Sequence, residues 1–168
     1  MAFDPWSYAE KAELEHSHQV ALFMWANMAT RFGLNAANNK SSYTVANHAA
    51  NDCLIHNDKV PQLKWLHAIH NQGHGDAVRG AKAKAEGVKP GVYDLFLPVV
   101  MRYQPKFGND SPIAYCGLYL ELKVGKGQPS DIQNQFGMDM RAAGYAADVA
   151  WGWLEARDKI LAYLQLSA

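Results

Sequence analysis

Two carboxylates and one lysine lie in neighbouring apolar segments that are predicted to be strands. Asp94 is in the segment 91–97, and Glu121 and Lys123 are in the segment 118–124. A charged side chain in an apolar strand is costly to bury unless it is paired or binds a metal. Mg²⁺ takes hard oxygen ligands, usually one or two carboxylates together with waters and a substrate phosphate. These residue types therefore indicate metal-dependent hydrolysis of a phosphodiester bond.

Each of these residues has a defined role in such a reaction. Asp94 and Glu121 are expected to hold the metal, and the backbone carbonyl of Leu122 supplies a third oxygen. The ammonium group of Lys123 is expected beside the attacking water and the scissile phosphate, where it stabilises the charge that develops in the transition state. The competing interpretation is an ordinary salt bridge at an exposed strand end. Context favours catalysis, because the Glu-x-Lys triplet ends an apolar strand and Asp94 is in the strand before it.

Two further polar residues lie near predicted helix starts. Glu15 shares a helix face with apolar residues, so we expect it on the core side, where it is a candidate for a further metal ligand. It is equally compatible with a first-turn acidic residue that the helix dipole stabilises. Gln133 follows Ser130 by three positions, so it can form half of a capping box, or it can present its amide to a phosphate or to Lys123. Spacing alone leaves both alternatives open.

Hydrophobic periodicity and turn residues predict the elements that position these side chains. The first is a helix over 8–32, with a capping box at Ser7 and an end at Gly33. A short strand within 61–69, a short helix from Asp76 to Gly87, and strands over 91–100 and 115–124 follow it. The chain then continues with a helix over 130–143, a strand over 145–151, and a helix over 154–166 that has Leu154 in the core. Alternation within 115–124 places Glu121 and Lys123 on one face. The last strand–helix–strand passage favours two parallel neighbouring strands.

Two segments have no sustained period. Residues 35–58 are predicted to be a loop or a weak helix that serves as an insertion or a dimer contact. Residues 101–112 contain two prolines and are predicted to be a flexible connection between paired strands, because they are too long for a tight hairpin.

The composition is typical of one globular domain. The chain has 168 residues, 49% of them hydrophobic, with no apolar run long enough to span a membrane and no signal-peptide pattern. We therefore expect a single α/β domain over residues 1–168 inside the cell, with no membrane partner. Cys53 and Cys116 are isolated and are expected to be free thiols. His67, His70 and His74 do not have the spacing of a structural zinc site.

The charge balance restricts how the chain can bind nucleic acid. Its 16 basic and 16 acidic residues give a formal net charge of zero, whereas many phosphate contacts normally require a basic surplus. Any DNA-binding surface must therefore be local. The candidate DNA-binding residues are Asn71, Arg79, Lys82, Lys84, Lys89 and Lys126. A group of basic residues of this size is also compatible with a solvated helix face.

The ordered motifs resemble the VRR-NUC family, a branch of the PD-(D/E)XK nucleases, and especially its small stand-alone members from phages and bacteria. The matching segments are 15–19 (EHSHQ), 68–73 (AIHNQG), 84–94 (KAEGVKPGVYD), 117–123 (GLYLELK), Ser130 with Gln133, and Gly144 with Tyr145. Several motifs in order are more specific than any one of them. Tyr93 departs from the pattern, because the family usually has proline before the aspartate.

The resemblance implies a restriction-endonuclease-like α/β core with a central mixed β-sheet flanked by helices. It implies Asp94, Glu121 and the Leu122 carbonyl as metal ligands, Lys123 as the catalytic lysine, and Glu15 and Gln133 as further active-site residues. It also implies a cytoplasmic endonuclease of a bacterial cell or phage-infected host that uses Mg²⁺ or Mn²⁺ and no nucleotide cofactor. The small stand-alone relatives look like homodimers that cut branched DNA such as four-way (Holliday) junctions. The resemblance therefore implies branched DNA as the substrate and a homodimer as the assembly.

Two other functions are compatible with the sequence. One is a non-catalytic DNA-binding or assembly protein of the same fold, and the other is a restriction-like endonuclease that reads a base sequence. The presence of Asp94, Glu121 and Lys123 favours an enzyme over a binding module.

Overall fold

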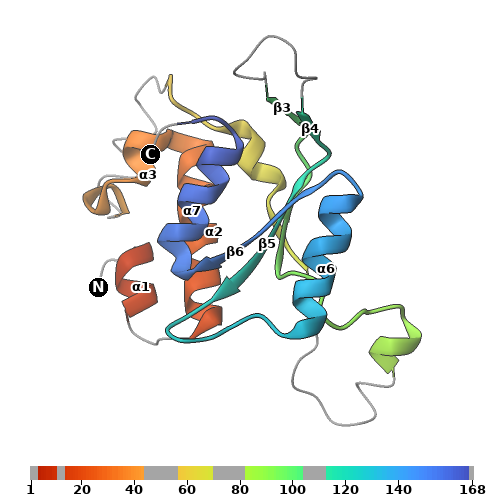
Figure 1. The fold of residues 1–168 in the computed structure, drawn as a ribbon. Coiled ribbons are helices and arrows are strands. Elements are labelled where there is room, and N and C mark those ends of the chain that lie inside the picture. The colour runs from red at the N-terminus through yellow and green to blue at the C-terminus, as the bar shows by residue number, and fades with distance from the viewer. Residues whose placement is uncertain (1–3, 11–13, 44–56, 70–81, 104–112, 167–168) are drawn as a thin grey trace. The chain divides into compact units, whose positions relative to one another are not determined.

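The computed structural model describes residues 4–10, 14–43, 57–69, 82–103 and 113–166, which form two compact units (Figure 1). One comprises Met1–Leu66, Leu122–Gly127 and Ala150–Ala168, and is called the helical unit. The other comprises His67–Glu121 and Gln128–Val149, and is called the sheet unit. Neither unit is continuous in sequence. In the described part of the chain no helix has the length and apolar character needed to cross a membrane.

The helical unit is organised around one long helix. Its elements are α1 (Pro5–Glu10), α2 (Glu15–Phe32), α3 (Leu34–Ala37), the 3₁₀ helices η1 (Lys40–Tyr43) and η2 (Pro61–Trp65), and α7 (Gly152–Tyr163). Helix α2 packs against α1, α3, η2 and α7. Trp25 of α2 and Ile160 of α7 are fully buried in this core, and the Trp25 indole donates a hydrogen bond to Asn38 Oδ1. Gly33 ends α2 with a φ of 93°, as predicted.

The prediction of one helix over 8–32 is wrong. Leu14 has extended backbone angles, φ −110° and ψ 138°, so α1 and α2 are separate helices and α2 begins at Glu15. The capping residue of α1 is Asp4, and Ser7 is its donor: Asp4 Oδ1 accepts from Ser7 N at 2.9 Å and Oδ2 accepts from Ser7 Oγ at 2.7 Å. A carboxylate one turn upstream caps the helix before Ser7 can do so.

Replacing Asp4 with alanine is expected to lower the free energy of unfolding by about 1–2 kcal/mol at neutral pH, because it removes a helix cap. Burial raises the pKa of Asp4, but hydrogen bonds from Ser7 and the nearby Lys40 outweigh it, so the pKa lies below the ordinary 3.8. A carboxylate with a depressed pKa contributes stability above its unfolded pKa, and this contribution is lost as the pH falls through the folded pKa. Urea unfolding at neutral and acid pH measures the difference.

Asp4→Asn is the matched control for this prediction, since asparagine is also a good cap but carries no charge. The asparagine variant should retain most of the free energy of unfolding at neutral pH, and that free energy should change less between neutral and acid pH than in wild type. Equal losses in both variants would contradict the capping role.

The sheet unit contains a four-stranded sheet in the order β1-β2-β5-β6. The strands are β1 (His67–Ala68), β2 (Leu95–Leu97), β5 (Leu118–Lys123) and β6 (Ala146–Trp151), and the last residues of β5 and β6 pass into the helical unit. β1 pairs with β2, and β2 with β5, in antiparallel fashion. Figure 1 shows β5 and β6 running in the same direction. The predicted α/β class with a mixed sheet is therefore confirmed.

Helix α6 (Asp131–Ala142) connects β5 to β6 and begins at the predicted capping box. Ser130 Oγ accepts from Gln133 N at 3.4 Å, and Gln133 Oε1 accepts from Ser130 N at 2.9 Å. This element was predictable because both halves of the motif are local in sequence.

Several strand and core predictions need correction. β2 covers only three of the residues 91–100, and Asp94 lies in a bend just before it. The predicted strand over 115–124 is interrupted between β4 (Ile113–Tyr115) and β5, and β4 pairs with β3 (Met101–Tyr103). The predicted connection therefore begins with a strand. Leu154, predicted to be in the core, is 41% exposed.

Gly137 of α6 gives Tyr93 the space that it occupies in the core. A Cβ at Gly137 would overlap the Tyr93 hydroxyl and lie 3.0 Å from Cζ, and Tyr93 is only 2% exposed. A helical Gly→Ala change normally stabilises by about 1 kcal/mol, but overpacking costs about 1–3 kcal/mol. Gly137→Ala is therefore expected to lower the free energy of unfolding, by up to about 2 kcal/mol net.

Tyr93→Phe in the same background removes the hydroxyl and should recover part of this loss in thermal or urea unfolding. Tyr93→Phe alone serves as the reference. Stabilisation by Gly137→Ala alone would show that Tyr93 does not pack against α6 in this way.

Candidate active site

The two predicted metal-binding carboxylates lie in adjoining parts of the sheet unit, Glu121 in β5 and Asp94 in the bend that precedes β2. Leu95 pairs with Leu120, and extending this antiparallel register by one residue places Asp94 opposite Glu121. The backbone of Asp94 is held next to the end of β1, because Ile69, which follows this strand, donates from N to the Asp94 carbonyl at 2.7 Å. Opposite residues of a ladder project from the same sheet face. The paired residues end at Leu95 and Leu120, so we infer the facing position of the two carboxylates from the register alone.

Glu121 is fully buried, and Gln133 contacts it directly. The Gln133 side chain donates from Nε2 to Glu121 Oε1, while its own Oε1 is used in the capping box. The capping-box interpretation of Gln133 is confirmed, and because the cap uses the amide oxygen, the amide nitrogen is available to the Glu121 carboxylate. Presentation of the amide to a phosphate stays a prediction. The partner is Glu121, not Lys123 as considered from the sequence. A buried carboxylate requires such donors, because an isolated buried charge is costly.

Lys123 and Glu15 form an ion pair in the helical unit. Lys123 Nζ lies 3.4 Å from Glu15 Oε1, and the two side chains are 9% and 50% exposed. The expectation that Glu15 faces the core is therefore wrong, because half of its side chain is exposed. Glu15 is the first residue of α2 and lies at the N-terminal end of that helix. Its proximity to Lys123 supports a role beside the lysine. Metal ligation by Glu15 stays a prediction.

The chemistry of the donor set fits Mg²⁺ or Mn²⁺ better than zinc. Asp94 and Glu121 offer only oxygen, and hard cations take one or two carboxylates completed by carbonyl, water and phosphate oxygens. Among the described residues no three or more His, Cys, Asp and Glu side chains are grouped to hold a metal. Metal binding by Asp94 and Glu121 stays a prediction. The carbonyl of Leu122 stays a predicted ligand. His70 and His74 lie outside the described residues.

A tight turn follows Lys123 and is closed by Trp151, which sequence reasoning missed. Gly127 N donates to the Val124 carbonyl at 2.9 Å, and Trp151 Nε1 donates to the Gly127 carbonyl at 2.9 Å. A Cβ at Gly127 would lie 3.5 Å from Lys123 Cδ, so the turn passes close to the lysine stem. No local pattern connects Trp151 with this turn, because they are distant in sequence.

Trp151→Phe is expected to loosen this turn, because it keeps the ring but removes the N–H donor. Losing one hydrogen bond of ordinary strength corresponds to an increase of about two- to tenfold in the open population of the turn. Reductive methylation of Lys123, followed by mass spectrometry, should accelerate by a similar factor. Trp65→Phe is the matched control, because Trp65 is another exposed tryptophan, at 59%. Equal labelling rates in all three proteins would contradict the positioning role of Trp151.

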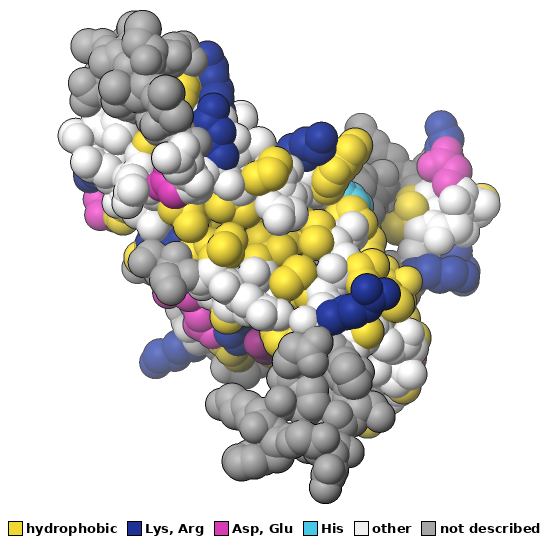
Figure 2. Space-filling model, turned by 90° about the horizontal axis from the view of Figure 1, so that it is seen from above, with side chains coloured by type: hydrophobic (Ala, Val, Ile, Leu, Met, Phe, Trp, Pro, Cys, Tyr) yellow, Lys and Arg dark blue, Asp and Glu magenta, His cyan; other side chains and the backbone are white. Residues whose placement is uncertain are grey.

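The structure describes four of the six predicted DNA-binding residues, three of them in the sheet unit and Lys126 in the helical unit. Lys82 and Lys84 are exposed on a helical turn at 82–85, and Lys82 pairs with Glu86 at 3.8 Å. Lys89 and Lys126 are also exposed. Asn71 and Arg79 lie outside the described residues. On the face shown in Figure 2, the described Lys and Arg side chains are scattered in small groups.

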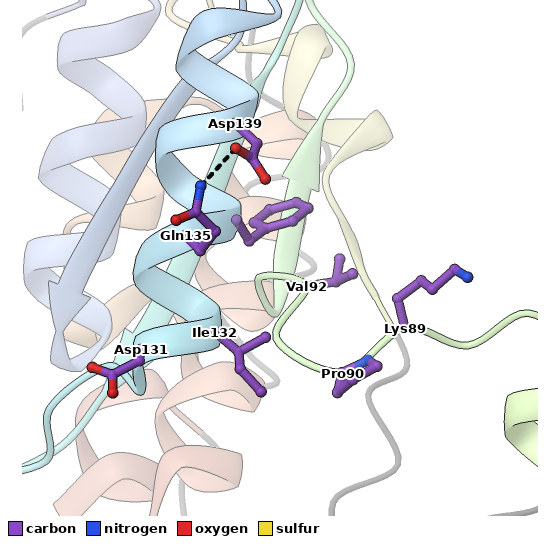
Figure 3. A pocket seen from close by; sticks show the side chains of 8 residues that line it. Lys89, Pro90, Val92, Asp131, Ile132, Gln135 and Asp139 are labelled. Carbon is purple, nitrogen blue, oxygen red and sulfur yellow. Dashed lines mark hydrogen bonds between the residues drawn. The ribbon is translucent and has the colours of Figure 1, made fainter.

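The sheet unit also contains an open pocket of about 450 Å³ that the sequence did not indicate. It is lined by Lys89, Pro90, Val92, Asp131, Ile132, Gln135, Phe136 and Asp139. Figure 3 shows Gln135 bonded to Asp139 along α6, at 2.8 Å, and Lys89 extending away from the helix. Its polar groups are thus engaged with each other or directed outwards, and Gln133 is not among its lining residues. This pocket is separate from the carboxylate pair.

Comparisons with known proteins give a match among the solved structures. No family model matches the sequence, and no curated protein matches it significantly. A solved structure described as "VRR_NUC domain protein" matches with a TM-score of 0.57 and 20% sequence identity, covering 91% of this chain and 89% of that chain. At this identity the match shows the fold. The resemblance inferred from the motifs, including the restriction-endonuclease-like α/β core, is therefore confirmed at the level of the fold.

Proposed function

We propose that this chain is a divalent-metal-dependent DNA endonuclease that hydrolyses phosphodiester bonds in branched DNA. The observation that carries the proposal is the arrangement along β5. Glu121 is a fully buried carboxylate bonded to Gln133, and Lys123, two residues later, is a nearly buried lysine paired with Glu15. The fold shared with a VRR_NUC domain protein supports the same assignment.

Each residue has a physical task in this proposal. A bound divalent ion supplies Lewis-acid polarisation of the phosphate and a more acidic water. Asp94 and Glu121 would hold that ion, and the Gln133 amide keeps the Glu121 carboxylate in one orientation. The Lys123 ammonium donates to the non-bridging phosphate oxygens, where charge grows in the transition state. Glu15 holds the ammonium in place without burying a second full charge, since it is half exposed.

The proposed substrate is branched DNA such as a four-way junction, cut by a homodimer. Paired cuts across a junction require two active sites, and a chain with one set of site residues provides two by dimerising. The zero net charge also fits recognition of a local structure better than tight binding along any duplex.

A panel of labelled substrates tests this proposal. The purified protein is incubated in Mg²⁺ or Mn²⁺ with a four-way junction, a flap, and a linear duplex of the same sequence, and the cut sites are mapped. Symmetrical cuts near the branch point of the junction support the proposal. Discrete products from linear plasmid DNA would support a sequence-reading endonuclease instead, and binding to DNA without any metal-dependent cleavage would support the non-catalytic alternative.

A further inference from the structure

Aromatic rings form a continuous row across three strands of the sheet unit. His67 of β1 stands edge-on to Phe96 of β2, with ring centroids 5.6 Å apart. Phe96 stacks on Tyr119 of β5 at 4.3 Å, and both contact Tyr145, at 6.0 and 5.4 Å. Phe136 of α6 packs against Tyr119 at 5.2 Å. We call His67, Phe96, Tyr119 and Tyr145 the aromatic row.

The aromatic row lies on the same sheet face as the carboxylate pair. Phe96 is directly opposite Tyr119 in the register, and Glu121 is the next residue of β5 on that face. Extending the register past Leu95, into the bend before β2, places Asp94 at the same position. Two residues along a strand span about 7 Å, so the rings are immediate neighbours of the proposed metal ligands. A nucleotide adjacent to a phosphate held at those ligands lies within reach of the row.

The exposure of the row differs from that of a sheet core. On the opposite face Leu95, Leu97 and Leu120 are 0%, 0% and 1% exposed, as expected of core residues. His67 is exposed, and Phe96, Tyr119 and Tyr145 are each partly exposed. Gly117 contributes to this arrangement, because a Cβ there would come within 2.7 Å of the Phe96 ring. The row is thus partly exposed, and it ends at the exposed His67 on the edge strand β1.

We propose that the aromatic row stacks an unpaired nucleobase of the DNA substrate next to the scissile phosphate. This inference rests on the proposed function, because the carboxylate pair defines which phosphate is meant. Base–aromatic stacking is tolerant of base identity, since every base has a π-face. A closed duplex keeps its bases paired and offers none to the row, whereas a branch point or flap does. The row therefore selects DNA with an unpaired base beside the cut and does not read a sequence.

Base stacking can be measured without cleavage. The full chain is mixed in EDTA with flapped DNA that carries 2-aminopurine at the unpaired position beside the branch, and with a fully paired duplex that carries the same base. Fluorescence reports stacking of the base, and anisotropy of a distal label reports binding. The test variant is His67→Ala combined with Phe96→Leu, which removes two ring faces but keeps apolar volume at position 96.

The proposal expects quenching of 2-aminopurine in flapped DNA and at least about a fivefold weaker binding of that DNA by the test variant, the lower limit for losing one stacked base. Binding of the paired duplex should be unchanged. Tyr103→Leu, an aromatic-to-leucine change in β3 outside the row, is the matched control and should behave as wild type. Equal losses for both DNAs, or no loss at all, would overturn the proposal. Because no cleavage is involved, an inactive protein that still quenches the base would refute only the proposed nuclease function.

Discussion

Replacing Lys123 with methionine is expected to lower the rate of DNA cleavage by about a hundredfold to a thousandfold, the cost of removing one donor that acts on transition-state charge. Methionine keeps most of the length and the apolar stem of lysine but lacks the ammonium that lies 3.4 Å from Glu15. Glu15 is half exposed, so its carboxylate remains solvated after the substitution and the fold should be retained. Single-turnover cleavage of a branched substrate in saturating metal measures the effect.

The matched control is Lys59→Met, because Lys59 is an exposed lysine of the same unit and no role in the site is assigned to it. It should cleave at the wild-type rate. The metal affinity of Lys123→Met should also stay close to wild type, since the lysine is not a ligand. Wild-type cleavage by Lys123→Met with its fold intact would show that this lysine is not catalytic.

Replacing Glu121 with glutamine is expected to remove both metal binding and cleavage. The side chain is fully buried, and glutamine has the same shape, so the packing against Gln133 is preserved while the charge is lost. In wild type, metal at a hundred times its dissociation constant should stabilise the fold by about 2.7 kcal/mol. In the variant this stabilisation should largely disappear, and cleavage should fall at least about a hundredfold, because even an outer partner of a metal ligand contributes about 10–100-fold.

Thermal unfolding with and without Mn²⁺ gives the binding result separately from activity. Glu86→Gln is the control, since Glu86 is an exposed glutamate of the sheet unit that pairs with Lys82. It should show the full metal-induced shift. A wild-type shift in Glu121→Gln would place the metal elsewhere in the chain.

Elements determined by local chemistry were predictable from the sequence. The capping box at Ser130 places the start of α6, and Gly33 places the end of α2, because each signal acts within one turn of the helix. The alternation around Glu121 and Lys123 correctly predicted a strand there, β5. Pattern and structure agree where neighbouring residues alone decide the backbone.

Features that depend on distant residues were not predictable in the same way. Leu14 interrupts the helical pattern although its side chain favours a helix, and β3 forms because β4 is available to pair with it. The pairing of Glu15 with Lys123 and the contact of Gln133 with Glu121 are likewise tertiary. The motifs identified these four residues as candidates, and the capping role of Gln133 was predicted correctly, but its contact with Glu121 was not foreseen and Glu15 was assigned the wrong degree of burial.

The most direct test of the account is a Mn²⁺ titration in which metal binding and cleavage of a branched DNA are followed in the same wild-type preparation. Calorimetry gives the binding curve, and single-turnover rates give the activity curve. Activity is expected to rise and saturate together with metal occupancy, and both curves should be lost in Glu121→Gln. Cleavage that persists in EDTA, or that survives in Glu121→Gln, would contradict the claim that this carboxylate and a divalent metal carry the reaction.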